Sequence, residues 1–213
     1  MSFTLVLLGP PGAGKGTQAA RVRKIWGIPH ISTGAILRDA VREATPLGRR
    51  IEAVMASGGL IDDDLITRIV CERLDQADAR GGCILDGFPR TIPQAESLDQ
   101  FIAGRPPLVI VDVELSDEDV LRRLAARMIC AECGTNSEDV DTSARCHNCG
   151  GPLVPRADDA EAVVRNRLHV YRRQTAPLIS FYGARPTFRQ VDGAQLFDDV
   201  TRDLVRAVES AAG

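Results

Sequence analysis

The sequence is poor in lysine, in aromatic residues and in long apolar runs. Among its 26 basic residues only Lys15 and Lys24 are lysines, and the formal net charge is −3 at pH 7. This balance lacks the bulk basicity of nucleic-acid-binding proteins, so we expect no nucleic-acid partner. No apolar run is long enough to span a membrane, and the first residues lack the basic segment of a secretory signal. We therefore expect a cytoplasmic protein without a membrane partner.

A chain of 213 residues with 44% apolar residues can form one domain with a substantial core. Five short apolar segments fit β-strands, and sequence of helical character separates each from the next. They are residues 3–8, 29–31, 83–85, 108–113 and 187–191. The alternation predicts an α/β fold with a five-stranded parallel sheet flanked by helices.

Two segments depart from this alternation. Residues 32–61 have helical character but are too long for one crossover helix, and Pro46 interrupts them. Residues 130–155 are rich in Gly, Asp, Ser and Cys and show little periodicity. Irregular insertions of this kind in a compact domain are usually functional, and the cysteines favour a lid in the second.

A glycine-rich loop follows the first predicted strand and precedes a helical segment. It reads Gly9-Pro10-Pro11-Gly12-Ala13-Gly14-Lys15-Gly16-Thr17-Gln18. Strand, glycine loop, lysine and helix form the P-loop arrangement, in which backbone N–H groups surround a phosphate at the positive end of the helix dipole. Lys15 would add a positive charge at the outer phosphates of a nucleoside triphosphate. A glycine-rich turn without a ligand is the alternative interpretation.

A second motif, Asp86-Gly87-Phe88-Pro89-Arg90, directly follows the third predicted strand. An aspartate at the carboxyl end of a buried strand beside a P-loop is placed to hold Mg²⁺, usually through water. Arg90 offers a planar guanidinium group to a further phosphate. A tight turn with a solvated arginine is the alternative for these five residues taken alone.

Four of the six cysteines form two Cys-x-x-Cys pairs. They are Cys130 and Cys133, then, after twelve residues, Cys146 and Cys149. Four thiolates on two tight turns predict a tetrahedral structural Zn²⁺ site, although the ligands alone do not distinguish zinc from iron. Two disulfides and a substitute ligand, His147, are the alternatives considered. Cys71 and Cys83 are expected to be buried as small apolar side chains.

Together these motifs resemble those of the adenylate kinase family, over essentially the whole chain and in the family's order. The matching segments are the loop at 9–18, Ile31-Ser32-Thr33-Gly34, Asp86-Gly87-Phe88-Pro89-Arg90-Thr91 with Gln94, Arg156-x-Asp158-Asp159, Arg165-x-Arg167 and Thr175-Ala176-Pro177-Leu178. The loop's Gly16-Thr17 ending is the form found in this family. The resemblance implies reversible transfer of the terminal phosphoryl group of Mg-ATP to AMP, giving two ADP, for adenine nucleotide homeostasis. Members are usually monomers.

The resemblance also implies a role for individual residues. Those implied to bind ATP are Gly12, Ala13, Gly14, Lys15, Gly16, Thr17, Arg123, Arg127 and Gln195. Those implied to be catalytic are Lys15, Asp86, Arg90, Arg123, Arg127, Arg156, Asp158, Asp159 and Arg167. Arg123 and Arg127 stand four apart on one predicted helix, so we expect them to share a face. A solvated arginine face, and helix capping by Asp158 and Asp159, are the alternatives.

The residues implied to bind AMP are Thr33, Arg38, Gly59, Leu60, Ile61, Gly87, Arg90, Gln94, Arg156 and Arg167. Thr33 favours AMP, since UMP-CMP kinases typically carry alanine there; a helix N-cap is the alternative for Thr33. Ala35 departs from the family, which normally has Asp at this position. We expect the loss of that carboxylate to alter how the AMP-binding insertion hinges or how Arg38 is held, without abolishing activity.

The resemblance divides the chain into a core, 1–31, 62–126 and 157–213, an AMP-binding insertion, 32–61, and a LID insertion, 127–156. Mg²⁺ with ATP and a structural Zn²⁺ are the implied cofactors. Another nucleoside monophosphate kinase, acting on UMP, CMP or GMP, is the main alternative function. A nucleotide-binding module without catalysis is a further alternative. It is disfavoured by the presence of Lys15, Asp86, Arg90, Arg123, Arg127, Arg156 and Arg167.

Overall fold

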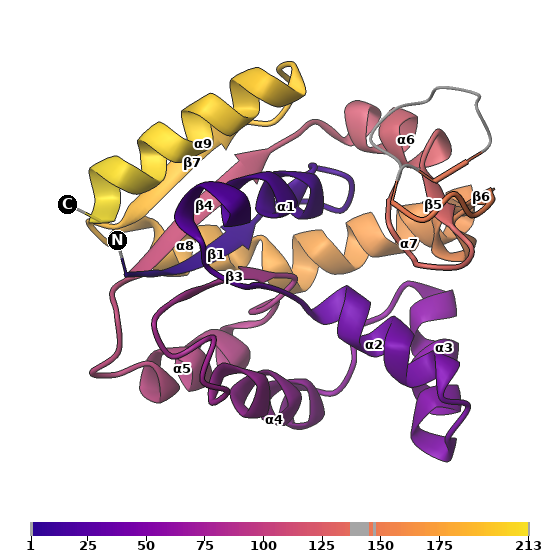
Figure 1. Cartoon of the computed structure of the whole chain (residues 1–213), viewed down its shortest axis with the longest axis horizontal. Helices are drawn as coiled ribbons and strands as arrows, with labels where there is room; N and C mark the ends of the chain where they lie inside the picture. Colours follow the sequence, from indigo (N-terminus) through magenta and orange to yellow (C-terminus); the bar gives the residue numbers. More distant parts are fainter. Residues whose placement is uncertain (1, 137–144, 147, 213) are drawn as a thin grey trace.

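The computed structural model describes residues 2–136, 145–146 and 148–212. A parallel sheet with the strand order β2-β3-β1-β4-β7 lies at its centre (Figure 1). The strands are β1 (Thr4–Leu8), β2 (His30–Ser32), β3 (Cys83–Asp86), β4 (Leu108–Glu114) and β7 (Phe188–Asp192). The predicted five-stranded parallel sheet and all its strands are therefore confirmed.

Helices cover both faces of this sheet. One face packs against α1 (Lys15–Trp26) and α9 (Phe197–Ala212), the other against α4 (Asp63–Leu74), α5 (Ile92–Phe101) and α8 (Pro177–Gly183). Along β1, Leu5 and Leu7 join the first cluster, whereas Val6 and Leu8 join the second. A strand buried on both faces is apolar at successive positions, which explains the unbroken apolar run before the glycine loop.

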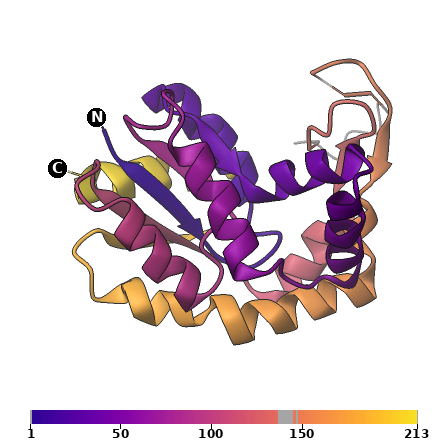
Figure 2. The same cartoon turned by 90° about the horizontal axis from the view of Figure 1, so that it is seen from below.

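Two helices leave the layered core and form a helical insertion, as Figures 1 and 2 show. They are α2 (Thr33–Arg42) and α3 (Pro46–Ser57). The predicted break between them is confirmed. Thr45 Oγ1 accepts a hydrogen bond from the Gly48 backbone N–H at 3.0 Å, and Pro46 occupies the first turn of α3, where a missing N–H costs nothing.

A second small lobe carries the cysteines. It contains an antiparallel pair, β5 (Met128–Cys130) and β6 (Leu153–Pro155), which follows α6 (Asp117–Ala125). Ser116 caps α6, because its Oγ accepts a hydrogen bond from Asp119 N–H at 3.1 Å. The expectation that Arg123 and Arg127 share one helical face is wrong, since α6 ends at Ala125 and Arg127 lies beyond it.

The sequence predicts a long helical segment from Asp158 to Tyr182, and the structure divides it. A 3₁₀ turn (Ala157–Asp159) precedes α7 (Glu161–Val170), and a π-helical turn (Tyr171–Thr175) joins α7 to α8. The interruption precedes Pro177, which has no N–H to continue an α-helical pattern. No helix in the described part of the chain is both long and apolar enough to cross a membrane.

Candidate active site

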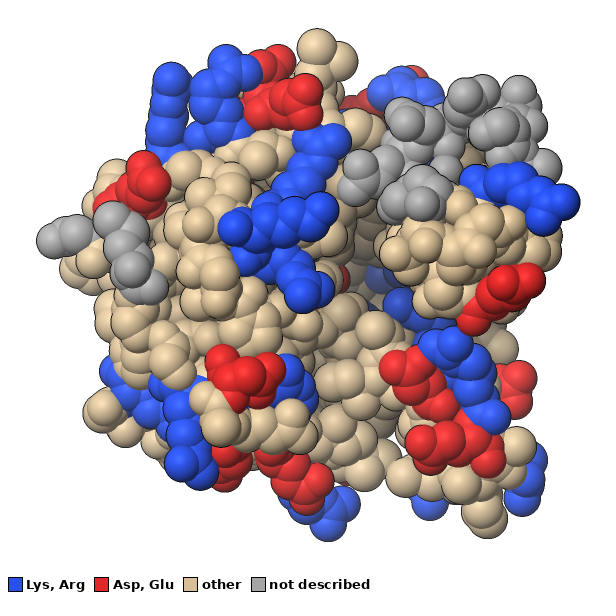
Figure 3. Space-filling model, viewed as in Figure 1, with Lys and Arg blue, Asp and Glu red and all other residues tan. Residues whose placement is uncertain are grey.

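A cavity of about 650 Å³ opens at the carboxyl ends of the central strands, between the sheet, the helical insertion and the cysteine lobe. The molecular surface is hollowed at this place (Figure 3). Eight basic side chains line the cavity, against two carboxylates. A chain with a net charge of −3 thus concentrates positive charge in one recess, which suits a polyanion.

The glycine loop forms one wall of this cavity. Gly14 (φ 87°) has the left-handed conformation that glycine adopts without strain, and α1 begins directly after it. Lys15 Nζ donates to the carbonyl oxygens of Gly9 at 2.8 Å and Pro10 at 2.7 Å. Its ammonium group therefore lies inside the turn, at the positive end of the α1 dipole, where a phosphate would sit.

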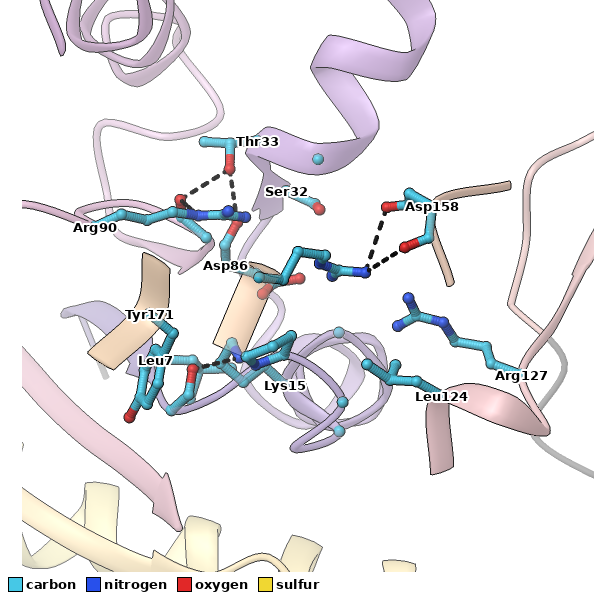
Figure 4. Close-up of a pocket in the computed structure, with 18 of the residues that line it drawn as sticks. Leu7, Lys15, Ser32, Thr33, Asp86, Arg90, Leu124, Arg127, Asp158 and Tyr171 are labelled. Atoms are coloured by element: carbon cyan, nitrogen blue, oxygen red, sulfur yellow. Dashed lines mark hydrogen bonds and ion pairs between the residues drawn. The ribbon is translucent and has the colours of Figure 1, made fainter. Parts of the chain in front are cut away.

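Asp86 ends β3 beside Lys15, and both point into the same space in Figure 4. Burial raises the pKa of Asp86, but the contact with His30, whose Nε2 lies 3.5 Å from Asp86 Oδ2, and the charge of Lys15 outweigh it and keep the pKa below its usual value. Asp86 is therefore an ionised carboxylate. A Cβ at Gly16 would lie 3.2 Å from Asp86 Oδ2, so this close approach explains why glycine follows the lysine.

An arginine cluster faces the loop from the cysteine lobe and α7. Arg127 pairs with Asp159 through two contacts of 2.6 Å, and Arg167 reaches the same carboxylate at 2.9 Å. Arg156 pairs with Asp158 at 2.5 and 2.7 Å. Burial, followed by other charges of the cluster, lowers the pKa of Arg127 and of Arg167. Three guanidinium groups thus share two carboxylates, which leaves the cluster with a net positive charge.

Asp158 and Asp159 do not cap the following helix. The residue before α7 is Ala160, and α7 has no side-chain cap. The carboxylates point at the arginines instead, which disfavours the capping interpretation of the sequence.

The opposite end of the cavity carries uncharged polar groups. Thr33 Oγ1 donates to the Gly87 carbonyl oxygen at 3.0 Å, and Ser32, one residue earlier, caps α2 by accepting from Ala35 N–H at 3.4 Å. The N-cap interpretation of Thr33 is therefore wrong. The guanidinium group of Arg38 lies against Gly34, where a Cβ would be only 3.2 Å from it. Arg38 faces the cavity, and Ala35 supplies no carboxylate to pair with it.

The cavity brings together most residues that the sequence singled out. The lining includes Gly12, Gly14, Lys15, Gly16, Thr17, Thr33, Arg38, Gly59, Leu60, Ile61, Asp86, Gly87, Arg90, Gln94, Arg123, Arg127, Arg156, Asp158, Arg167 and Gln195. Ala13 is buried within the loop, and Asp159 pairs with Arg127. Neither lines the cavity.

Several lining residues were missed by the sequence analysis. Tyr171 lies at the π-helical turn, Arg122 precedes Arg123, and Leu196 and Phe197 lie at the start of α9. The guanidinium carbon of Arg123 is 5.9 Å from the centre of the Phe197 ring, close enough for a cation–π contact. An aromatic residue in the first turn of an amphipathic segment was the sequence signal for Phe197.

The four cysteine sulfurs form a separate cluster in which all ligand atoms lie within 4.8 Å of one another. Cys130 Sγ and Cys149 Sγ are 3.4 Å apart, and Cys133 Sγ and Cys146 Sγ are 3.6 Å apart, too far for disulfide bonds. Four thiolates bound 2.3 Å from one Zn²⁺ would lie about 3.8 Å apart. The cluster therefore fits a tetrahedral metal site.

Two tight turns present these sulfurs. Gly134 (φ 69°) donates to the Cys130 carbonyl oxygen at 3.0 Å, and Gly150 (φ 74°) donates to that of Cys146 at 2.8 Å. Each turn thus needs a left-handed residue directly after its second cysteine, which explains both glycines. The alternative ligand His147 lies outside the described residues.

Comparison with known proteins decides the family. The family model "Adenylate kinase" matches residues 7–187 of the chain. The chain belongs to the adenylate kinase family.

Adenylate kinases from several organisms are similar to this chain along almost its whole length. The chain is 44% identical to one from Moorella thermoacetica (96% of this chain, 97% of the relative) and 46% identical to one from Geobacter sp. strain M21 (98% and 100%). An adenylate kinase from Methanocella arvoryzae is 41% identical, with 97% of this chain and 99% of the relative covered. The chain is therefore a phosphotransferase of the nucleoside monophosphate kinase type.

The adenylate kinase site has a titratable lysine. Burial, followed by the neighbouring Arg90 and Arg167, lowers the pKa of Lys15 to about 8, although Asp86 opposes the shift. A bound phosphate favours the charged form, so Mg-ATP binding should take up a proton at pH 9 and none at pH 6.5. Affinity should fall roughly tenfold from pH 7 to pH 9. Calorimetry in two buffers of different protonation enthalpy measures both effects.

A matched control for this pH dependence is Lys15→Arg, whose guanidinium group stays charged throughout this range. The variant should bind Mg-ATP without proton uptake at pH 9. Equal proton uptake by both proteins would assign the titration to another group.

Proposed function

We propose that this chain is an adenylate kinase that holds Mg-ATP and AMP at opposite ends of one cavity and transfers the terminal phosphoryl group between them. The observation that carries the proposal is the placement of the cations. They line one cavity together with the P-loop and with Thr33 and Gln94. Phosphoryl transfer needs little covalent chemistry from the protein, so positioning and charge neutralisation in this region supply the catalysis.

ATP would bind through the loop and the arginines facing it. The backbone N–H groups of residues 12–17 would surround its phosphates, and Lys15 would leave the Gly9 and Pro10 carbonyls for the outer phosphates. Arg123 and Arg127 would approach from the cysteine lobe. Gln195 and Phe197 would contact the adenine, since both line the cavity and Phe197 lies beside Arg123.

AMP would bind at the opposite end of the cavity. Arg38 and Arg90 would hold its phosphate, together with Arg156 and Arg167. Leu60, Ile61 and the backbone at Gly59 would contact the base, and Gln94 would hydrogen-bond its edge. All of these side chains line the same cavity, which supports a common phosphate region for the two nucleotides.

Adenylate kinases use Mg²⁺ with ATP, and Asp86 is the carboxylate we propose for it. Its low pKa and its position beside Lys15 suit a ligand that acts through water. The ion supplies charge neutralisation between the phosphates when it is bound. The chain's own contribution is to keep Asp86 ionised and Gly16 small enough for close approach.

The cysteine lobe would be the lid of this enzyme, and α2–α3 its AMP-binding insertion, with the boundaries 127–156 and 32–61. Closure of the lid would bring Arg127 and Arg156 onto the phosphates and exclude water, so that AMP and not water accepts the phosphoryl group. Asp159 pairs with Arg127, and Asp158 pairs with Arg156. We expect the enzyme to work as a cytoplasmic monomer.

We propose Zn²⁺ for the four-cysteine cluster. Sulfur-to-sulfur separations of 3.4 and 3.6 Å and backbone N–H groups of Cys133 and Asn148 directed at sulfur suit four thiolates around one ion. Iron with four thiolates would have similar geometry, so elemental analysis of freshly purified protein decides between them. The site's role would be structural, since all four positions are protein ligands.

Replacing one ligand, Cys130→Ser, should lower the melting temperature by roughly 5–10 °C, because the lobe has little apolar core and depends on the metal. Turnover at low temperature should change much less. Differential scanning calorimetry and a coupled ADP assay measure the two quantities. Cys71→Ser, a cysteine outside the cluster, is the matched control. A melting temperature equal to that of the control would contradict the structural role.

The acceptor is tested by offering AMP, CMP, UMP and GMP to the purified protein with Mg-ATP. ADP formation should be clearly fastest with AMP. A preference for CMP or UMP would replace the proposal with another nucleoside monophosphate kinase activity. Tight ATP binding without turnover on any acceptor would instead indicate a binding module.

A further inference from the structure

The amide of Gln94 is held from two sides. Its Nε2 donates to Asp63 Oδ1 at 2.6 Å, and its Oε1 accepts from the Arg90 backbone N–H at 2.7 Å. Gln94 is 2% exposed, lies in the first turn of α5 and lines the cavity. Both contacts are short, so the amide has one preferred orientation in a buried position.

Asp63 makes a second contact that fixes its own position. Its Oδ2 accepts from Thr91 Oγ1 at 2.9 Å, and the same Thr91 Oγ1 caps α5 by accepting from Gln94 N–H at 3.3 Å. Asp63 does not cap its own helix, since Asp62 Oδ1 accepts from Leu65 N–H at 3.2 Å. Its carboxylate is therefore directed toward the start of α5 and the amide of Gln94.

These partners determine which way the amide of Gln94 faces. A carboxylate accepts only, and a backbone N–H donates only. Rotating the amide of Gln94 by half a turn would set its oxygen against Asp63 and its NH₂ against the N–H of Arg90. Both hydrogen bonds would become repulsive contacts in a buried place. Asp63 contributes the charged contact of the pair.

We propose that Asp63 is a positioning residue that locks the amide of Gln94 and thereby makes the acceptor site select a 6-aminopurine over a 6-oxopurine. This inference rests on the proposed function, in which Gln94 meets the base of the acceptor. Asp63 and Arg90 use one N–H and one lone pair of the amide, so one of each is left for a base. With the amide held in this orientation, its free N–H and its free lone pair keep fixed positions relative to the base.

Those positions matter because two purines reverse the order of donor and acceptor. Adenine has an acceptor at N1 and a donor at its 6-amino group, whereas hypoxanthine has a donor at N1 and an acceptor at its 6-oxo group. An amide held in the orientation that pairs with adenine would set its N–H against the N1–H of hypoxanthine and its oxygen against the 6-oxo oxygen. An amide that turns freely pairs with either. The discrimination between AMP and inosine monophosphate should therefore depend on Asp63.

The test compares AMP and inosine monophosphate as acceptors for Asp63→Ala. The ratio of their kcat/KM values should fall roughly tenfold, the worth of one charge-assisted hydrogen bond, while the KM for ATP stays unchanged. Asp64→Ala is the matched control, because Asp64 lies in the same first turn of α4 but is exposed. The control should keep the wild-type ratio.

A second variant, Asp63→Asn, preserves the side-chain volume and serves if the alanine variant does not fold. Its amide can present either an oxygen or an N–H to Gln94, so the ratio should again fall, by less. An unchanged AMP-to-inosine monophosphate ratio in the folded variant, even with both rates lowered equally, would overturn the inference and leave Asp63 a structural role. Failure of the proposed function would be visible separately, as absence of AMP turnover by the wild-type protein.

Discussion

Lys15→Met should lower turnover by roughly 10³-fold while the protein stays folded. The ammonium group lies inside the P-loop turn, 2.8 and 2.7 Å from two carbonyl oxygens, and no second lysine lines the cavity in the described residues. In comparable sites, removing one preorganised group that stabilises the transition state lowers the rate roughly 10²–10³-fold. Removing an arginine that contacts the transferred phosphoryl group lowers the rate further. Steady-state ADP formation and circular dichroism measure the two quantities.

The matched control for this change is Lys24→Met. Lys24 is the chain's other lysine and lies exposed in the last turn of the same helix. This variant should keep wild-type turnover. Activity of Lys15→Met within a few-fold of the control would refute the role of Lys15 in transfer, and loss of the folded state would assign Lys15 to stability.

Asp159→Asn should destabilise the protein by roughly 3 kcal/mol. The Asp159 side chain is 5% exposed and pairs with both Arg127 and Arg167, so its loss removes a buried negative charge from between two partly buried cations. For a chain of this length the change corresponds to a melting temperature lower by roughly 6–12 °C. A nucleotide polyphosphate should recover part of the loss, because it binds the folded form and replaces the missing negative charge.

Glu161→Gln is the matched control for this stability change. Glu161 pairs with Arg165 one turn further along α7, and both side chains are largely exposed. Exposed pairs contribute about 0.3–0.5 kcal/mol, so the control should melt within about 2 °C of wild type. If Asp159→Asn melted with the control, the arginine cluster would not depend on this carboxylate.

Local patterns in the sequence were sufficient for the sheet, the glycine loop and the cysteine site. Each strand is short, apolar and bounded by helical sequence, and the four cysteines lie at metal-ligand spacing. The break before α3 was predictable for the same reason, since Thr45 and Pro46 are both start signals of a helix. In each of these places, residues that are close together in the sequence supply everything that the local structure needs.

Sequence interpretations failed where the local pattern left a helix boundary open. A helix cap was the alternative interpretation of Thr33, but Ser32 takes that role and leaves the Thr33 hydroxyl for Gly87. Arg123 and Arg127 looked like one helical face, but α6 ends between them. The spacing of residues does not indicate which of two adjacent caps, or which of two helix ends, tertiary packing selects.

Other features depend on contacts between distant segments and left no local signal. Asp63 stands in the first turn of a helix, where an acidic residue is explained by the dipole alone, yet it contacts Gln94 from 31 positions away. The ion pairs that Asp159 makes likewise form only because α7 and the cysteine lobe lie against each other. Such pairings follow only from the folded arrangement.

Direct transfer between two nucleotides is the central claim, and the fate of a labelled phosphoryl group tests it most directly. Mg-ATP labelled in its terminal phosphate is mixed with AMP and the purified protein. The label should appear in ADP, as the terminal phosphate added to AMP, with one unlabelled ADP formed for each labelled one. Label released as inorganic phosphate, at a rate that does not depend on AMP, would contradict the account.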